Sequence, residues 1–432
     1  MKLISRTALY FTIIISGLAG SASASTPNPT TEPLVQPSNL VYLGSFQLPR
    51  IPCSSPTYGC FYYGGTAITY NATDNSLYVV GHPYGDLTAE VSIPTPVKSA
   101  SPNDLPTATL LQNFTDSLEG KRNSVNPPDT NPHYIGGQLV YNGKLIISVY
   151  SYYDGAGTQS TSHFTRPLNL TTTGQLAGPF RVGTLYPGFV SGYMTVIPPE
   201  WQPLFGGPAL TGNCCLAIAS EQSNGPAVSV FDPSTLGAQN PAPATPILGY
   251  PHSNPVSYQG TQSAWGVTSD VYNGTTDITG IAFPVGTRSV LFFGSQGTGP
   301  FCYGPGTSTS PPPSGYCYDP AASGKGTHAF PYAYQIWAYD ADDLLKVKGG
   351  IEPQYTPEPY NIWQLNLPFS SDTNLHKLGG VAYDPTTSRL YISQECVYAN
   401  CSPIIDVFEV NMGASAAPPG TEPSAPSNVI VN

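Results

Sequence analysis

Charged residues are scarce in this chain of 432 residues. Asp, Glu, Lys and Arg together make up 9% of it, and acidic residues outnumber basic residues by 26 to 15. Surfaces that bind nucleic acid or anionic membranes need clusters of lysine and arginine, so this composition argues against both partners. The residues that favour helices on polar surfaces are also few, which argues against a helical fold.

Several well-known site motifs are missing. The sequence contains no Gly-x-Ser-x-Gly, no His-Glu-x-x-His, no Cys-x-x-Cys-His and no Walker-type phosphate loop. No apolar run beyond residue 24 is long enough to span a membrane, so we expect no membrane insertion. The enzyme and carrier classes that depend on these motifs are therefore not indicated.

The two ends of the chain differ from its middle. Lys2 and Arg6 precede a short apolar run, and residues 22–24 (ASA) offer a cleavage site, so residues 1–24 are predicted to be a signal peptide. The protein is then secreted or periplasmic. Residues 25–39 and 413–432 are rich in Pro, Ser and Thr, which predicts a flexible leader and a disordered tail around one domain of residues 40–412.

Glycine, proline and tyrosine are abundant, with 44, 47 and 29 residues. Together with short apolar runs they predict many strands and many turns. Residues 378–395 (LGGVAYDPTTSRLYISQE) have the pattern of a β-hairpin, and versions of this hairpin recur. The other copies begin at Gly64, Gly136, Gly192 and Thr279, and the copy at Gly192 resumes at Cys215 after an insertion.

A third apolar strand follows each hairpin, and a fourth follows several of them, which predicts an all-β fold, a β-propeller of five blades. Six blades remain open because residues 232–275 could contain a weak one, and a pair of two-sheet sandwiches is the competing architecture. Residues 40–49 (LVYLGSFQLP) resemble a fourth strand and should complete the last blade, closing the ring.

The eight cysteines fall into close pairs. In an oxidising compartment, local disulfides are expected for Cys53 with Cys60, Cys302 with Cys317, and Cys396 with Cys401. The adjacent Cys214 and Cys215 could form a vicinal disulfide, remain free thiols or belong to separate disulfides.

Antiparallel pairing places the start of a first strand beside the end of the second strand, on one face near the channel. Polar residues occupy these positions: His133, Asp277 and His376 at first-strand starts, and His82, Glu221 and Glu395 at second-strand ends. The histidines His82, His133 and His376 could bind a divalent metal ion. The carboxylates Glu221, Glu395 and Asp277 could share general acid and base roles. Alternatively, each is a separate rim residue bonded to nearby backbone.

Aromatic residues lie at the same face. Tyr62 and Tyr63 precede the first hairpin, and Tyr150 follows the second; such rings suit sugars or apolar ligands, or they pack between blades. Arg166 is a further candidate if the ligand is an anion. The long connections 94–132 and 297–330 could act as lids, the second bringing His328 towards the face.

The repeated Gly-Gly hairpin resembles secreted bacterial β-propeller proteins, and residues 191–215 and 288–304 look like blocks from a family of exported proteins. This resemblance implies a fold and no specific site. Three functions stay open: binding of a small molecule or glycan at the His/carboxylate face, hydrolase or lyase chemistry there with or without a divalent metal, or a scaffold for an unspecified protein partner.

Overall fold

The computed structural model of the chain describes residues 28–127, 129–213, 222–258, 261–262, 271–370 and 377–413. The described residues form five antiparallel sheets of four strands each. Blade one contains β2 (Ile68–Asn71), β3 (Ser76–Val80), β4 (Thr88–Ser92) and β5 (Leu110–Thr115). Blade two contains β6 (His133–Tyr141), β7 (Lys144–Ser151), β8 (His163–Pro167) and β9 (Ala177–Phe180). Blade three contains β10 (Met194–Val196), β11 (Ala209–Gly212), β12 (Val228–Phe231) and β13 (Ala244–Leu248).

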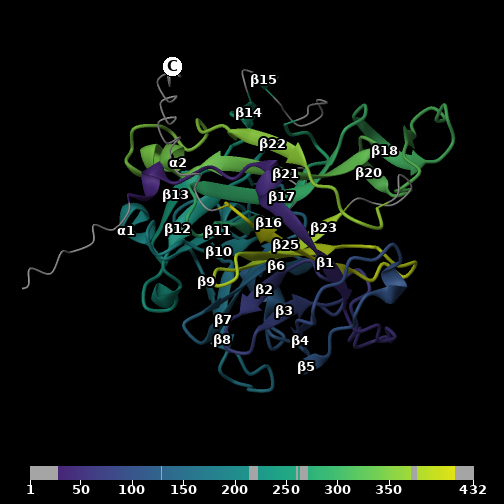
Figure 1. Ribbon diagram of the computed structural model, residues 1–432, viewed down its shortest axis with the longest axis horizontal. Coiled ribbons are helices and arrows are strands. Elements are labelled where there is room, and N and C mark those ends of the chain that lie inside the picture. The colour runs from purple at the N-terminus through teal and green to yellow at the C-terminus, as the bar shows by residue number, and fades with distance from the viewer. Residues whose placement is uncertain are drawn as a thin grey trace, which may run out of the picture.

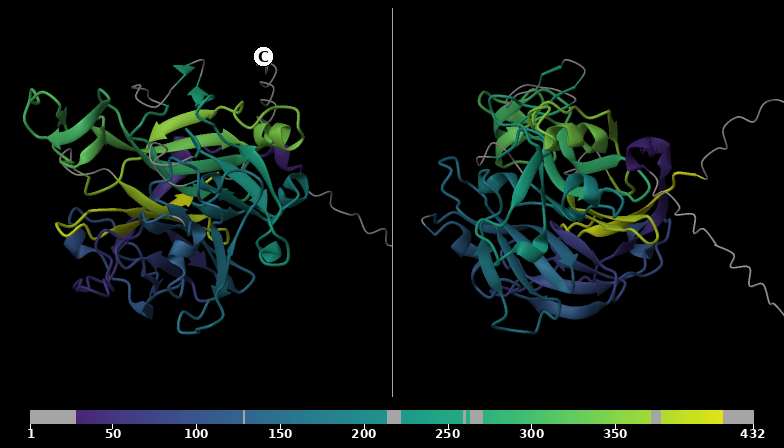
Figure 2. Two further views of the ribbon diagram at one scale, coloured as in Figure 1. Left: turned by 180° about the vertical axis from the view of Figure 1, so that it is seen from behind. Right: turned by 90° about the vertical axis from the view of Figure 1, so that its left-hand side faces the viewer.

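In the last two blades the four strands are not all consecutive in the sequence. Blade four contains β16 (Asp277–Ala282), β17 (Ser289–Gly297), β21 (Tyr332–Asp340) and β22 (Asn361–Gln364). Blade five contains β23 (Leu378–Asp384), β24 (Arg389–Gln394), β25 (Ile404–Val410) and the N-terminal strand β1 (Leu40–Gln47). An arm inserted in blade four carries β18 (Cys302–Thr307), β19 (Cys317–Tyr318) and β20 (Lys325–His328). This arm projects from the edge of the ring (Figures 1 and 2).

A few short elements complete the described chain. The α-helices are α1 (Gln202–Phe205) and α2 (Ala341–Lys348), and β14 (Ser257–Tyr258) pairs with β15 (Thr261–Gln262). The 3-10 helices are η1 (Pro29–Thr31), η2 (Pro37–Asn39), η3 (Pro102–Asp104), η4 (Arg122–Val125), η5 (Pro187–Phe189) and η6 (Pro233–Thr235). Residues 232–275, where a sixth blade was considered, contribute β13 to blade three and the two-stranded β14–β15 to the described structure.

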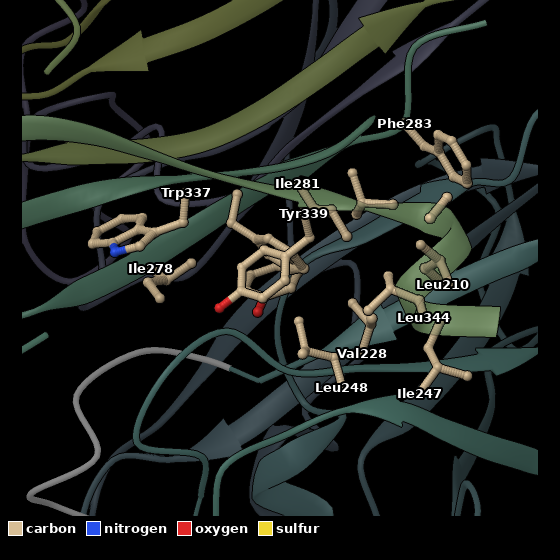
Figure 3. Packing of buried hydrophobic residues seen from close by; sticks show 14 of the residues in the cluster. Leu210, Val228, Ile247, Leu248, Ile278, Ile281, Phe283, Trp337, Tyr339 and Leu344 are labelled. Atoms are coloured by element: carbon tan, nitrogen blue, oxygen red, sulfur yellow. The ribbon is translucent and has the colours of Figure 1, made fainter. Parts of the chain in front are cut away.

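The apolar side chains show that the sheets form a ring. Alternate residues of a strand point to opposite faces of its sheet, so a blade buried on both faces needs a neighbour on each side. The described core divides into five clusters, each between two successive blades and the last between blades five and one. Figure 3 shows the cluster between blades three and four, where Leu210 and Leu248 lie near Ile281 and Tyr339.

The N-terminal strand closes the ring, as the sequence predicts. β1 pairs antiparallel with β25, from Leu40 opposite Val410 to Gln47 opposite Ile404. In Figure 1 the purple N-terminal strand accordingly lies beside the yellow C-terminal strands. The five-bladed propeller predicted from the repeats is therefore the observed fold.

Three local expectations were wrong. The second strand of blade three is β11, which begins at Ala209, and the predicted strand at Cys215 lies outside the described residues. The connection 94–132 contains β5, the fourth strand of blade one. Residues 28–39, expected to be flexible, pack on blade four: Val35 is fully buried and Tyr360 donates a hydrogen bond to its carbonyl at 2.7 Å.

The Gly-Gly pairs of the repeat lie where the innermost strands meet. The pairing register shifts around the glycines of β6, β16 and β23, as in a β-bulge. A β-carbon added to Gly137 would stand 2.0 Å from the carbonyl oxygen of Gly192 in the next blade. One added to Gly379 would stand 2.0 Å from the carbonyl oxygen of Gly65. Glycine is therefore required because backbones of neighbouring blades touch, and a cavity of about 10 Å³ lies between residues of all five innermost strands.

The disulfides Cys53–Cys60, Cys302–Cys317 and Cys396–Cys401 are present, as predicted. Disulfides are typical of proteins that fold in an oxidising compartment. Cys214 and Cys215 and the predicted signal peptide lie outside the described residues. Among the helices that the structure describes, none is long and apolar enough to cross a membrane.

Replacing Gly137 by alanine should destabilise the protein by about 2–3 kcal/mol, because the methyl group would overlap the carbonyl oxygen of Gly192, in the backbone just before β10 of the next blade. Chemical denaturation would measure the loss. Gly155→Ala is the control, since no described atom lies within 4 Å of its added β-carbon, and it should change stability by less than about 0.5 kcal/mol. Equal effects of the two substitutions would contradict the close-contact explanation.

Asp406 on β25 is a fully buried carboxyl at the ring closure. Ser45 of β1 donates a hydrogen bond to its Oδ1, and in the described part of the chain Oδ2 has no partner. Burial raises the pKa of Asp406 to about 7, against the lowering effect of the Ser45 hydrogen bond. Between pH 4 and 7 the folded protein therefore keeps a proton that the unfolded chain releases, and this group makes stability fall as pH rises.

Asp406→Asn should remove that contribution. We expect the variant to match the parent near pH 4 and to exceed it at pH 8, with about 1.4 kcal/mol for each unit of the pKa difference as the upper bound. Urea denaturation across this range gives the difference curve. Asp104→Asn, at an exposed position, should leave the curve parallel to that of the parent. A gain at pH 4 equal to that at pH 8 would show that the titration of Asp406 is not the cause.

Candidate functional site

One face of the ring gathers the ends of strands from several blades. His133 at the start of β6 pairs with Ser151 at the end of β7, and Asp277 at the start of β16 pairs with Ser295 of β17. Leu378 at the start of β23 pairs with Gln394 of β24. We call this the upper face. His133, Asp277 and Glu395, from three different blades, lie at this face.

An ion pair and a second carboxylate lie at the upper face between blades four and five. The Lys377 Nζ atom is 3.8 Å from Glu395 Oε2, and the Glu395 amide donates to the Lys377 carbonyl at 3.0 Å. Glu395 is 5% exposed, whereas the side chain of Lys377 is 43% exposed and reaches solvent. Asp277 is close enough to both for its charge to affect their titration.

Burial dominates the electrostatics of this group. It raises the pKa of Glu395 to about 7, with Lys377 opposing the rise and Asp277 adding to it. It also raises the pKa of Asp277, again against the effect of Lys377. Glu395 raises the pKa of Lys377 in turn, so the lysine stays cationic. Asp277 Oδ1 is buried and accepts no hydrogen bond from the described residues.

Tyrosines of blade two lie near this charged group and near Asp86 of blade one. Burial, followed by the nearby charges of Asp277 and Asp86, raises the pKa of Tyr150 well above its ordinary value. The rings of Tyr134 and Tyr150 have centroids 6.0 Å apart, and the ring of Tyr152 is also 6.0 Å from Tyr134. Tyr152 is 48% exposed, so its ring is accessible to a ligand.

A second charged group lies at the upper face beside blade two. Arg122 is 3.3 Å from Asp86, whose Oδ2 also accepts from the Ile135 amide at 2.9 Å. Burial raises the pKa of Asp86 to about 6, although Arg122 lowers it. The side chain of Arg122 is 30% exposed, so part of this guanidinium faces solvent.

His133 is buried next to this pair. Its Nε2 is 3.2 Å from Ser151 Oγ, and Ser151 Oγ donates to Asp129 Oδ2 at 2.8 Å. Burial lowers the pKa of His133, with Asp129 opposing that effect, so the ring is held neutral at pH 7. Its Nδ1 makes no hydrogen bond with any described residue. The serine bonds to both the histidine and the aspartate, an arrangement that differs from a Ser-His-Asp triad, in which the aspartate bonds to the histidine.

His82 lies among aromatic rings rather than beside His133. The ring centroids of Tyr58, Tyr63 and Tyr84 are 4.9, 5.7 and 5.0 Å from its own. Its Nδ1 accepts a hydrogen bond from the Tyr84 amide at 3.1 Å. Tyr63 is 51% exposed and Tyr62 is half-buried.

The predicted metal ligands are not assembled in the part of the chain that can be described. His82 and His133 have different neighbours, and no group of three His, Cys, Asp or Glu side chains there could hold a metal ion. His376, the third predicted ligand, and Glu221, a predicted acid or base, lie outside the described residues.

Arg166, suggested as an anion ligand, lies at the opposite end of its blade. It pairs with Leu145 near the start of β7, and its guanidinium donates to the carbonyl oxygens of Ser117, Leu170 and Thr172. Arg166 is only 2% exposed, because these bonds secure it in the interior. His328 also makes an internal contact, since its Nδ1 is 2.7 Å from Asp319 Oδ2 inside the arm.

Sequence reasoning missed the cations of the site. Lys377 follows the predicted His376 directly, and its place at a first-strand start could have identified it. Arg122 lies between β5 and β6 and Asp86 between β3 and β4, outside the repeated hairpin, so the repeat contains no signal for them.

Comparison with known proteins gives a likeness in fold alone. No family model and no curated protein matches the chain. Among solved structures it is similar to a GH43 endo-arabinanase from Bacillus licheniformis, with 12% identity, 81% of this chain and 94% of that chain covered, and a TM-score of 0.39. It is also similar to an exo-1,5-α-L-arabinanase from a bovine ruminal metagenomic library, with 11% identity, 79% of this chain and 90% of that chain covered, and a TM-score of 0.40. It is also similar to a DUF4221 family member from Bacteroides vulgatus, with 9% identity, 88% of this chain and 99% of that chain covered, and a TM-score of 0.36.

Proposed function

We propose that the upper face binds a small polyhydroxylated ligand, such as a glycan, in contact with Asp277, Lys377 and Glu395. The observation that carries this proposal is that two carboxyls lie close enough to affect the titration of a lysine whose side chain is 43% exposed, so acceptors and a donor gather at a face that reaches solvent. A hydroxyl group can both donate and accept a hydrogen bond, so a ligand with several hydroxyl groups can pair with both kinds of group.

The surrounding groups favour a neutral ligand with many hydroxyl groups. Lys377 supplies a donor that reaches solvent, and the two carboxyls supply acceptors on either side of it. The exposed ring of Tyr152 offers an apolar face of the kind on which a sugar ring stacks. A strongly anionic ligand would face two carboxyls and a single lysine in this group.

A second candidate is hydrolysis of such a ligand at the same place. It is favoured by the pKa of about 7 for Glu395, which suits a group that donates a proton near neutral pH. In this reading Glu395 protonates the leaving oxygen, and Asp277 is the second carboxyl that a glycoside hydrolase requires.

Asp277→Ala and Lys377→Met should each weaken binding of a neutral oligosaccharide at least tenfold, because each removes a hydrogen-bonding group from the site. The measurement is calorimetric titration with the best ligand from a panel of neutral, acidic and amino oligosaccharides. Asp343→Ala and Lys346→Met are matched controls, since this ion pair, at 2.7 Å, lies on α2 away from the upper face. Equal losses in the controls, or no loss in the site variants, would contradict the proposal.

Glu395→Gln should separate binding from turnover. If Glu395 is a proton donor, the variant should release product at least about 100-fold more slowly, while its Kd for the same oligosaccharide stays within about threefold. Chromatography of the digested oligosaccharide provides the rate. Absence of product with the parent protein would reject hydrolysis of that substrate and leave binding as the function of the site.

A further inference from the structure

A recess opens at the other end of the channel, on the lower face. It is a cavity of about 460 Å³, a size typical of small-molecule sites. All five blades contribute to its wall through the ends of their innermost strands and the turns that follow. Its apolar wall includes Tyr70, Leu139, Met194, Phe283, Val285 and Tyr383.

The lower recess is separate from the upper face. The glycine contacts between the innermost strands lie between the two, around the cavity of about 10 Å³ described above. A ligand in the lower recess therefore cannot reach Asp277 or Lys377. The inference below does not rest on the function proposed for the upper face.

Hydrogen bonds across blades hold the rim of the lower recess in place. The Val285 amide of blade four donates to the Tyr383 hydroxyl of blade five at 3.2 Å. The Gly286 amide donates to Glu200 Oε1, which follows β10 of blade three, at 3.1 Å. A recess fixed in this way is formed before a ligand arrives, which lowers the entropy lost on binding.

The charge of the lower recess has one sign. Its described lining contains one carboxylate, Glu200, and no lysine, arginine or histidine. A second carboxylate lies nearby, since Glu200 raises the pKa of Glu32, although burial of Glu32 contributes more to that rise. Three aromatic residues, Tyr70, Phe283 and Tyr383, line the same cavity, and the faces of aromatic rings attract cations.

We propose that the lower recess binds a small apolar molecule carrying one cationic group, a hydrophobic amine. The apolar body occupies the wall formed by the five strand ends. The ammonium group lies at the rim, where the Glu200 carboxylate and the aromatic rings attract it. Burial of the apolar body supplies most of the affinity, and the carboxylate supplies the preference for positive charge.

Three probes of similar size test the charge preference: 4-phenylbutylamine, 4-phenyl-1-butanol and 4-phenylbutyrate. Ligand-observed NMR titration of the whole protein at pH 7 measures each Kd, which we expect near 1 mM for the amine. The amine should bind at least tenfold more tightly than the carboxylate, with the alcohol between them. Equal affinity for amine and carboxylate, or no binding of any probe up to 10 mM, would overturn the proposal.

Two variants locate the binding. Glu200→Gln should bring the affinity for the amine to within about twofold of that for the alcohol, whereas Glu352→Gln, outside the recess, should change neither. Val196 lines the recess and is 40% exposed, so Val196→Trp should block it without disturbing the core and weaken all three probes at least tenfold. Binding that persists in Val196→Trp would place the amine elsewhere and reject the site. Lys377→Met should leave amine binding unchanged, and a loss in that variant would assign the amine to the upper face instead.

Discussion

The close approach of the innermost strands at their glycines determines the form of this propeller. The backbone of one blade occupies the space where a side chain of the next would stand, as at Gly137 against Gly192 and at Gly379 against Gly65. Only glycine permits such contact, and the register shifts in β6 and β23 adjust the strands around it. The channel is consequently closed in its middle.

A closed middle separates two faces with different chemistry. On the upper face the ends of strands carry ionisable groups, including Asp277, Glu395 and Lys377, while on the lower face they carry apolar groups such as Leu139 and Met194. Within each strand the side chains point alternately to the two neighbouring blades. The apolar residues in the middle of the strands therefore pack in the five clusters between blades. Only residues at strand ends and in connections are free to differ between the faces.

The same division explains what could be predicted from the sequence. The hairpin repeat and the closing strand β1 were predictable, because alternating apolar residues and glycines recur in each blade. The strand β5 was missed because the fourth strand is the outermost one, with one side open to solvent and little pattern. The position of Asp277 and Glu395 at one face follows from the repeat, whereas Asp86 and Arg122 lie on connections outside the repeated hairpin. Arg166 was misplaced because a guanidinium bonded to backbone carbonyls cannot be distinguished in sequence from one that faces a ligand.

Both faces contain residues that the fold alone does not favour. Asp277 and Glu395 lie at strand ends, where asparagine or glutamine could form similar hydrogen bonds without a buried charge, and burial raises the pKa of each. In the lower recess, apolar strand ends line an open cavity although polar residues there would interact better with water. A ring whose only role was structural would be more stable with these residues exchanged. The two arrangements therefore cost stability in opposite ways, through buried charge on one face and exposed apolar surface on the other, and a ligand of matching chemistry at each face would offset that cost.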